Sequence, residues 1–246
     1  MNNLVLVMAV LLGLTAFAQN ADEIIEKADE RMRGKTSTAE MTITTIRPKW
    51  QREMKIKAWT KGDDYSSILV LYPAKDKGSV FLKRKNEIWN YLPSIERTIK
   101  MPPSMLSQSW MGTDMTNDDL VKESSLKDDF TKKIVDSTIL EGLDCYKIEM
   151  IPKEGVNSIW GKIMIWVSKT DYLQLKMEFY DEDNFLVNTM LGKEVKMMGG
   201  KRMPTVLEIT PADKEGQLTR ITYTSMKFDL EIDDARFTTQ YMKQLK

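Results

Sequence analysis

The sequence predicts a mainly β (α+β) fold in which antiparallel strands form a curved sheet or open barrel around a filled interior. Segments with apolar residues at every second position follow one another at hairpin spacing, and turn residues separate them. One amphipathic helix precedes these segments, and too few helices follow to cover a flat sheet of this size. The sheet must therefore curve around its own apolar face, as in open barrels.

The helix is expected at 22–33, with Asp22 as its N-terminal cap and Gly34 as its stop. Apolar residues recur along one side of it at helical spacing, so this side can pack on the sheet. These residues are Ile24, Ile25, Ala28 and Met32.

Strands are expected on both sides of an interruption at about 102–133. The strand at 173–180 alternates most clearly, because Leu173, Leu175, Met177 and Phe179 share one face. The strands before the interruption span about 38–47, 51–60, 65–72, 79–84 and 87–92. Those after it span about 133–139, 144–151, 160–168, 173–180, 185–197, 203–210 and 217–228.

The interrupting segment predicts a short helix at 104–111, which begins after Pro102 and ends before Gly112. A helix this short is stable only when its apolar side docks on the protein. It is either a plug that closes one end of the barrel or a movable lid over an apolar cavity, and the sequence leaves both open. Its apolar side consists of Met105, Leu106, Trp110 and Met111.

The composition excludes several classes of function. The chain of 246 residues has 36 basic and 36 acidic residues, a balance that argues against nucleic-acid binding. It contains no histidine, so a Ser-His-Asp triad, a Cys-His pair and a histidine-ligated zinc site are excluded. We expect no enzyme activity, no metal and no cofactor, because no other set of titratable groups converges.

The remaining polar motifs have structural interpretations. The acidic residues within 114–119 are suited to cap a helix that starts at about Thr116, and those at 181–183 to a solvated turn. Cys145, the only cysteine, lies in a strand-like stretch where it acts as a small buried hydrophobe. The basic run at 83–85 is interpreted as a solvated strand edge, with an anionic headgroup or acidic partner as the alternative.

Residues 1–18 have the pattern of a secretory signal peptide. An apolar run from Leu4 to Phe17 ends in Ala-Phe-Ala before Gln19, which fits a cleavage site. The run is shorter than the roughly 20 residues that a membrane-spanning helix needs. We therefore expect export and cleavage, which leaves a single domain at 19–246.

Two motifs carry a family likeness: Ile-Trp-Asn-Tyr-Leu-Pro-Ser at 88–94 and Ser-Trp-Met-Gly-Thr-Asp at 109–114. They resemble the outer-membrane lipoprotein-sorting family related to the LolA periplasmic carrier, and the resemblance covers essentially the whole mature chain. It implies an unclosed antiparallel β-barrel (half-barrel) with an N-terminal helix and short lid or plug helices on the concave face. In that family an arginine after an early strand locks the lid, whereas the stretch 59–63 offers Lys61, which lacks the arginine's fork of donors.

The resemblance implies a periplasmic carrier that binds lipid or acylated lipoprotein in a hydrophobic cavity. Such a carrier takes its cargo from an inner-membrane transporter toward an outer-membrane acceptor. The alternative is a periplasmic sensor or accessory protein that binds an envelope protein partner, for example an exporter of the resistance-nodulation-division type. A third interpretation, a carboxylate enzyme, requires acids of 114–119 to face another acid in a cleft. The sequence leaves the oligomeric state open.

The lipid-binding residues expected on the strands and lid are Trp59, Leu69, Leu71, Phe81, Trp89, Tyr91, Met105, Leu106, Trp110, Met111, Trp166 and Phe179.

Overall fold

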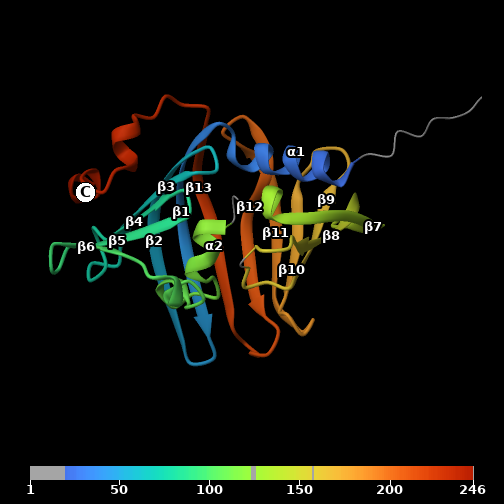
Figure 1. The fold of residues 1–246 in the computed structure, drawn as a ribbon, viewed down its shortest axis with the longest axis horizontal. Coiled ribbons are helices and arrows are strands. Elements are labelled where there is room, and N and C mark those ends of the chain that lie inside the picture. Colours follow the sequence, from blue (N-terminus) through green and yellow to red (C-terminus); the bar gives the residue numbers. More distant parts are fainter. Residues whose placement is uncertain (1–19, 123–125, 157, 246) are drawn as a thin grey trace, which may run out of the picture.

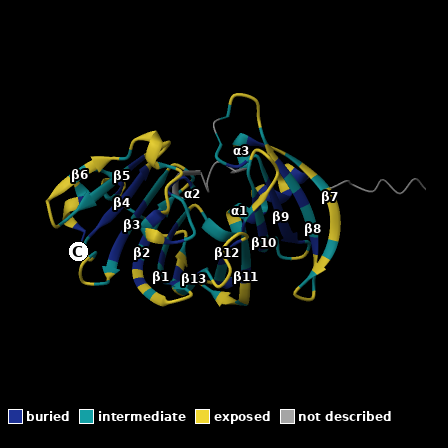
Figure 2. Cartoon of the chain, turned by 90° about the horizontal axis from the view of Figure 1, so that it is seen from below, coloured by how far each residue is buried: buried dark blue, intermediate teal, exposed yellow. Residues whose placement is uncertain are grey.

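A single antiparallel sheet of 13 strands makes up most of the molecule (Figure 1). The structure, a computed structural model, describes residues 20–122, 126–156 and 158–245; the predicted signal peptide at 1–18 lies outside the described residues. The strand order is β6-β5-β4-β3-β2-β1-β13-β12-β11-β10-β9-β8-β7. The edge strands β6 and β7 stand far apart, so the barrel is unclosed, as predicted (Figure 2).

The strands agree closely with the predicted segments. The first half of the sheet contains β1 (Thr36–Arg47), β2 (Trp50–Lys61), β3 (Tyr65–Tyr72), β4 (Val80–Arg84), β5 (Glu87–Leu92) and β6 (Arg97–Lys100). The second half contains β7 (Phe130–Leu140), β8 (Leu143–Pro152), β9 (Lys162–Ser168), β10 (Gln174–Tyr180), β11 (Leu186–Met198), β12 (Lys201–Pro211) and β13 (Leu218–Phe228). Only β6 was not predicted, because its four residues are too few to show a period of two.

Helix α1 (Ala21–Arg33) lies across the concave face of the sheet (Figures 1 and 2). Its cap is Asn20, whose side-chain oxygen accepts a hydrogen bond from the backbone N–H of Asp22 at 3.0 Å. The prediction of Asp22 as cap was therefore wrong by two residues, and Asp22 lies in the first turn instead. Gly34 ends the helix at a φ of 63°, a left-handed conformation that glycine adopts readily. The buried side of α1 packs on the concave core beside Phe130 and Ile148.

Both faces of the sheet carry apolar clusters. On the outer face, a C-terminal segment with turns η3 (Asp234–Phe237) and η4 (Tyr241–Gln244) covers β3, β4 and β5. Phe237, Met242 and Leu245 are buried there against Leu69 and Leu82. A second outer cluster surrounds Cys145 and Trp166. The sheet is therefore apolar on both faces over much of its area, whereas the alternation in the sequence predicted one wet face.

Strand β10 contains a correction to the predicted alternation. The pairing register between β9 and β10 shifts between Gln174 and Lys176. Residues before and after this irregularity therefore do not keep the simple alternation of faces. Leu173 consequently packs in the cluster around Trp166, whereas Met177 packs in the concave core.

The basic run at 83–85 does not form a sheet edge. Its strand, β4, lies between β3 and β5, and β6 is the edge. Lys83 is buried, and its Nζ donates to the Asp63 carbonyl oxygen at 2.6 Å. The interpretation as a solvated edge was therefore wrong for Lys83, because β5, the strand predicted at 87–92, pairs with β4 on that side.

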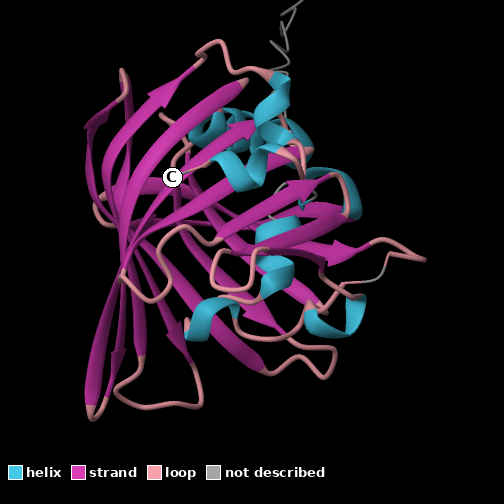
Figure 3. Cartoon of the chain, turned by 90° about the vertical axis from the view of Figure 1, so that its left-hand side faces the viewer, coloured by secondary structure: helices cyan, strands magenta, loops and turns pink. Residues whose placement is uncertain are grey.

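The segment between β6 and β7 begins with the residues 101–119, which we call the strap. The predicted helix at 104–111 is not formed; two separate 3-10 turns are present instead, η1 (Pro103–Met105) and η2 (Trp110–Gly112). The carbonyl oxygens of Leu106 and Gln108, which a helix would use internally, accept from the backbone N–H groups of Asp118 and Asn117. The strap thus folds back on itself and ends within the first turn of α2 (Asn117–Lys122), and α3 (Leu126–Asp129) comes next. Figure 3 shows the strands in magenta and the helical segments, including those of the C-terminal segment, in cyan.

Candidate binding cavity and its strap

The candidate site is a cavity of about 250 Å³ on the concave face of the sheet, beneath α1 and the strap. Most of its lining is apolar and comes from strands on both halves of the sheet. Wall residues from the first half and β13 include Ala39, Met41, Ile43, Ala58, Ile68 and Ile221, and those from the second half include Ile165, Met177, Phe179, Met190 and Ile209. The volume is slightly below the usual range of small-molecule pockets.

Small side chains at the centre of the sheet help to explain why a cavity exists. Ala39 on β1 and Ala58 on β2 are directly paired, and both line the cavity. Two facing alanines leave volume that a larger apolar pair would fill. A larger side chain at either position should therefore obstruct the cavity.

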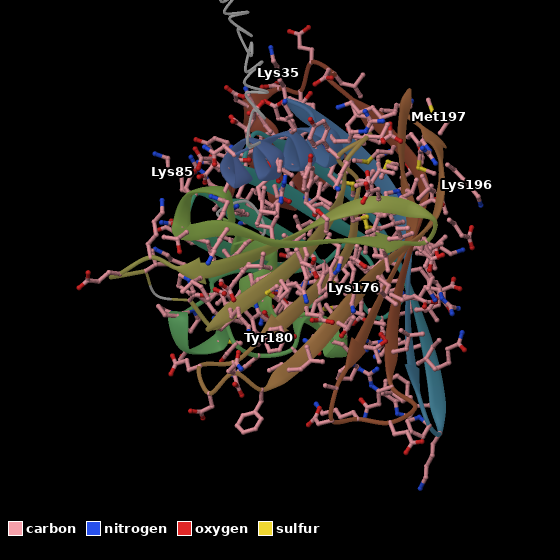
Figure 4. All side chains as sticks on the ribbon, turned by 90° about the vertical axis from the view of Figure 1, so that its right-hand side faces the viewer. Lys35, Lys85, Lys176, Tyr180, Lys196 and Met197 are labelled. Carbon is pink, nitrogen blue, oxygen red and sulfur yellow. The ribbon has the colours of Figure 1, made fainter. Side chains whose placement is uncertain are left out.

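Methionines supply seven of the lining residues: Met32, Met41, Met115, Met150, Met177, Met190 and Met226. Their unbranched, polarizable side chains adapt to ligands of varied shape. Met197, by contrast, is 68% exposed and lies beside Lys196 at the outer surface (Figure 4). Methionine is therefore concentrated on the cavity wall without being confined to it.

Arg47 anchors the strap to the sheet. This residue ends β1, and its guanidinium donates to both carboxylate oxygens of Asp114 at 3.0 Å each. Its Nη2 also donates to the Gly112 carbonyl oxygen at 3.2 Å. The Asp114 side chain is only 6% exposed, so the pair is largely shielded from water. A bidentate pair of this kind fixes both the position and the orientation of the strap.

Further hydrogen bonds hold the strap at the same place. Thr219 Oγ1 on β13 donates to Asp114 Oδ2 at 2.7 Å and accepts from the Asp114 backbone N–H at 2.9 Å. Asn188 Nδ2 on β11 donates to the Asp114 carbonyl oxygen, and Arg52 on β2 donates to the Met111 carbonyl oxygen. Four strands of the sheet thus contact three residues of the strap, Met111, Gly112 and Asp114.

Trp110 is the apolar anchor of the strap. It is 1% exposed and meets Phe81 edge to face, with ring centroids 5.5 Å apart. Its Nε1 has no hydrogen-bond partner among the described residues. The strap therefore closes the cavity here in the manner of a plug.

Asp119 lies where the strap enters α2 and lines the cavity. Its Oδ2 accepts from the Thr116 backbone N–H at 2.7 Å, and Thr116 Oγ1 accepts from the Asp119 N–H at 3.1 Å. This reciprocal pair is a capping box, and α2 begins at Asn117, which confirms a helix start at about Thr116 with an acidic residue in its cap. Burial raises the pKa of Asp119 to about 6, and the nearby charge of Asp118 acts in the same direction. Asp114, in contrast, caps no helix and pairs with Arg47.

The raised pKa of Asp119 predicts a pH dependence of stability. Its folded pKa of about 6 exceeds the ordinary value of 3.8, so the folded state binds the proton first as the pH falls. Relative to Asp119→Asn, the free energy of unfolding of the wild type should rise by about 2 kcal/mol between pH 7 and pH 4. Denaturant titrations of both proteins at several pH values measure this difference, and parallel curves would contradict the prediction.

The structure brings two of the predicted lipid-binding residues to the cavity, Trp110 and Phe179. Phe81 and Met111 pack beside Trp110 but do not line the cavity. Met105 is 38% exposed, and Leu106 is half-buried in the strap. The outer face holds Trp59, Leu69, Leu71, Trp89, Tyr91 and Trp166. These ten residues do not line the cavity. For the six on the outer face the cause is strand parity, because Ile68 and Leu69 on β3 point to opposite faces. Lipid binding by Trp110 and Phe179 stays a prediction.

Sequence reasoning missed the residues that hold the strap. Lys61, compared above with the lid-locking arginine, pairs instead with Asp234 of the C-terminal segment. The available signal was Arg47-Pro48, where an arginine ends the first strand directly before a proline turn. Its partner Asp114 is 67 residues away in sequence, and no local pattern connects the two.

Other candidate sites are not supported in the described part of the chain. No group of three or more histidine, cysteine or acidic residues there is placed to hold a metal ion. Cys145 is fully buried, as predicted, and burial raises the pKa of its thiol. Among the helices of residues 20–122, 126–156 and 158–245, none is long and apolar enough to span a membrane.

Fold and cavity together define a LolA-like half-barrel, and the comparisons agree. A DUF1329 family protein from Desulfovibrio piger is 22% identical, with a TM-score of 0.82 over 90% of this chain and 97% of its own. A LolA superfamily protein from Nitrosomonas europaea is 24% identical, with a TM-score of 0.77 over 91% of this chain and 100% of its own. An outer membrane lipoprotein-sorting protein domain from Vibrio parahaemolyticus is 21% identical, with a TM-score of 0.80 over 91% and 98%.

The sequence comparisons give the family. A family model described as an uncharacterized protein matches residues 62–244. The chain belongs to this family, and its fold is LolA-like. A comparison with curated proteins finds no match.

Proposed function

We propose that this protein is a periplasmic, non-enzymatic carrier that binds the acyl chains of a lipid or lipoprotein in the cavity. The observation that supports the proposal is an apolar cavity on the concave face, closed by a strap held through the Arg47–Asp114 pair. Transfer of a methylene group from water to apolar surroundings contributes about 0.8 kcal/mol, so acyl chains bind without specific polar contacts. The likeness to a lipoprotein-sorting domain supports the same function.

The proposal includes a transport route. Residues 1–18 act as a cleaved signal peptide, and 19–246 form one carrier domain in the periplasm. The strap opens to receive cargo from an inner-membrane transporter and opens again at an outer-membrane acceptor. Since release of the strap requires loss of the buried Arg47–Asp114 pair, exchange occurs only where a partner or membrane compensates for that loss.

Native mass spectrometry of the mature protein, purified without detergent, tests this function. We expect a bound mass that lipid extraction identifies as a lipid or an acylated peptide. A protein that stays unliganded after incubation with lipids and acyl-peptides would overturn the carrier proposal. Capture of an envelope protein without lipid would favour the sensor or accessory protein instead.

A variant that fills the cavity tests where the lipid binds. Ala58→Trp places a large side chain in the cavity wall and should reduce the retained lipid about ten-fold or more. Lys55→Trp is the matched control, because Lys55 lies on the same strand with its side chain 57% exposed. Retained lipid is measured by native mass spectrometry, with circular dichroism to confirm folding. Equal retention in both variants would place the lipid elsewhere.

A further inference from the structure

One end of the cavity is polar, in contrast to its apolar walls. Ser37 near the start of β1, Thr60 near the end of β2 and Ser66 near the start of β3 all line it. The pairings Ser37↔Thr60 and Thr60↔Ser66 place these hydroxyls side by side at one end of the sheet. This is the end at which α1 connects to β1; Arg47 lies at the opposite end of β1.

Four charged residues surround this end, and we call them the charged rim: Asp29, Arg33, Asp63 and Lys127. Arg33 Nε donates to Asp29 Oδ1 at 2.6 Å, and Lys127 Nζ pairs with Asp63. The side chains of the Asp29–Arg33 pair are 16% and 18% exposed, and those of Asp63 and Lys127 are 30% and 31% exposed. The rim therefore lies where the cavity meets solvent.

The two ion pairs of the charged rim lie close enough to interact. The hydrogen bond to Asp63 raises the pKa of Lys127, and the charge of Asp29 on α1 acts in the same direction. Lys83 Nζ donates to the Asp63 carbonyl oxygen, so the turn that carries Asp63 is fixed by a buried side chain. Two cations and two carboxylates thus lie together at one opening.

This arrangement discriminates among headgroups. A purely anionic group bound to Arg33 and Lys127 would leave the half-buried carboxylates of Asp29 and Asp63 without their cations and would be repelled by them. An uncharged head offers no partner to any of the four. A head with both a phosphate and an ammonium group supplies an opposite charge to each member of both pairs.

We propose that the charged rim is a headgroup site for a zwitterionic amphiphile whose head carries a phosphate and an ammonium group. The cations of the rim bind the phosphate and its carboxylates bind the ammonium, while the acyl chains extend along the apolar walls toward Trp110. Ser37 Oγ and Thr60 Oγ1 lie 2.6 Å apart and share one proton, which leaves the other for an ester oxygen of the ligand. This site rests on the proposed function, to which it adds the class of cargo and its direction in the cavity.

The test compares three lipids with identical acyl chains: phosphatidylethanolamine, phosphatidylglycerol and diacylglycerol. Native mass spectrometry measures their retention by the mature wild type in pairwise competition. We expect phosphatidylethanolamine to exceed each of the others about ten-fold. In Asp29→Asn with Asp63→Asn, two cations remain without carboxylates, so the preference should reverse toward phosphatidylglycerol.

The matched control is Asp183→Asn with Asp213→Asn, which removes the same charge from exposed turns at the opposite end of the sheet. It should keep the wild-type preference. If the double substitution at the rim prevents folding, Lys127→Gln tests the site from its cationic side and should reduce retention of both phospholipids relative to diacylglycerol. Retention without headgroup preference, or an unchanged preference in the rim variants, would overturn the headgroup site and leave the carrier standing. A wild type that retains none of the three lipids would overturn the headgroup site, and it would overturn the carrier as well if it also retains no acyl-peptide.

Discussion

Replacement of Arg47 by alanine should lower the free energy of unfolding by about 3–5 kcal/mol, since it leaves the carboxylate of Asp114 buried without its cation. The same change removes the donor to the Gly112 carbonyl oxygen, so the strap should detach before the sheet unfolds. Denaturant unfolding measures the first effect. Hydrogen exchange of residues 101–119 measures the second, and faster exchange there than in β1 and β2 is expected.

Two controls separate this effect from a general loss of charge. Arg202→Ala removes an arginine from an exposed pair with Asp171, at 2.5 Å, and should cost at most about 1 kcal/mol. Arg47→Leu with Asp114→Leu removes both buried charges and should recover much of the loss. If Arg47→Ala costs no more than Arg202→Ala, the pair does not hold the strap.

The order and extent of the strands could be predicted because each strand carries its own local signal. Turn residues and a period of two locate a strand within a few residues, and short hairpin connections then pair successive strands without long-range information. Pairing of β1 with β13 follows once the two halves of the sheet are joined edge to edge. The half-barrel was therefore accessible from the sequence.

The faces of the strands could not be predicted in the same way. In β3 both faces are apolar, because the C-terminal segment covers the outer one. Leu69 and Ile68 are thus equally hydrophobic, and only the position of the C-terminal segment decides which of them meets the cavity. Trp59 and Trp89 were expected in the cavity as apolar residues of their strands, yet they pack outside it.

The strap was mispredicted because its structure depends on distant partners. Its prolines and Gly112 suit a short helix locally, but Asp114 is held by Arg47, Asn188 and Thr219 from three strands. These contacts outweigh the small helical propensity of a two-turn segment, which cannot form a helix alone. Met111 accordingly has a φ of 51°, outside the helical region.

Trp110→Ala should lower the free energy of unfolding by about 3–5 kcal/mol, because it empties a site that is 1% exposed. Trp110→Phe should cost much less, below about 1.5 kcal/mol, since it keeps the ring against Phe81. It also removes an indole N–H that has no partner among the described residues, and so offsets part of the lost packing. An acidic residue at this position would place a charge in a buried site and destabilise the fold. Its effect on lipid binding could then not be distinguished from its effect on folding.

The comparison of these two variants distinguishes a fixed plug from a movable lid. Both enlarge the cavity, but only Trp110→Ala loosens the strap, so a lid predicts faster exchange of bound lipid in Trp110→Ala than in Trp110→Phe. A plug predicts the same exchange rate in both, because lipid would then enter by the charged rim. Denaturant titration gives the stabilities, and transfer of labelled lipid to vesicles gives the exchange rates. Phe185→Ala is the control, since Phe185 is 69% exposed and its loss should change stability by at most about 1 kcal/mol.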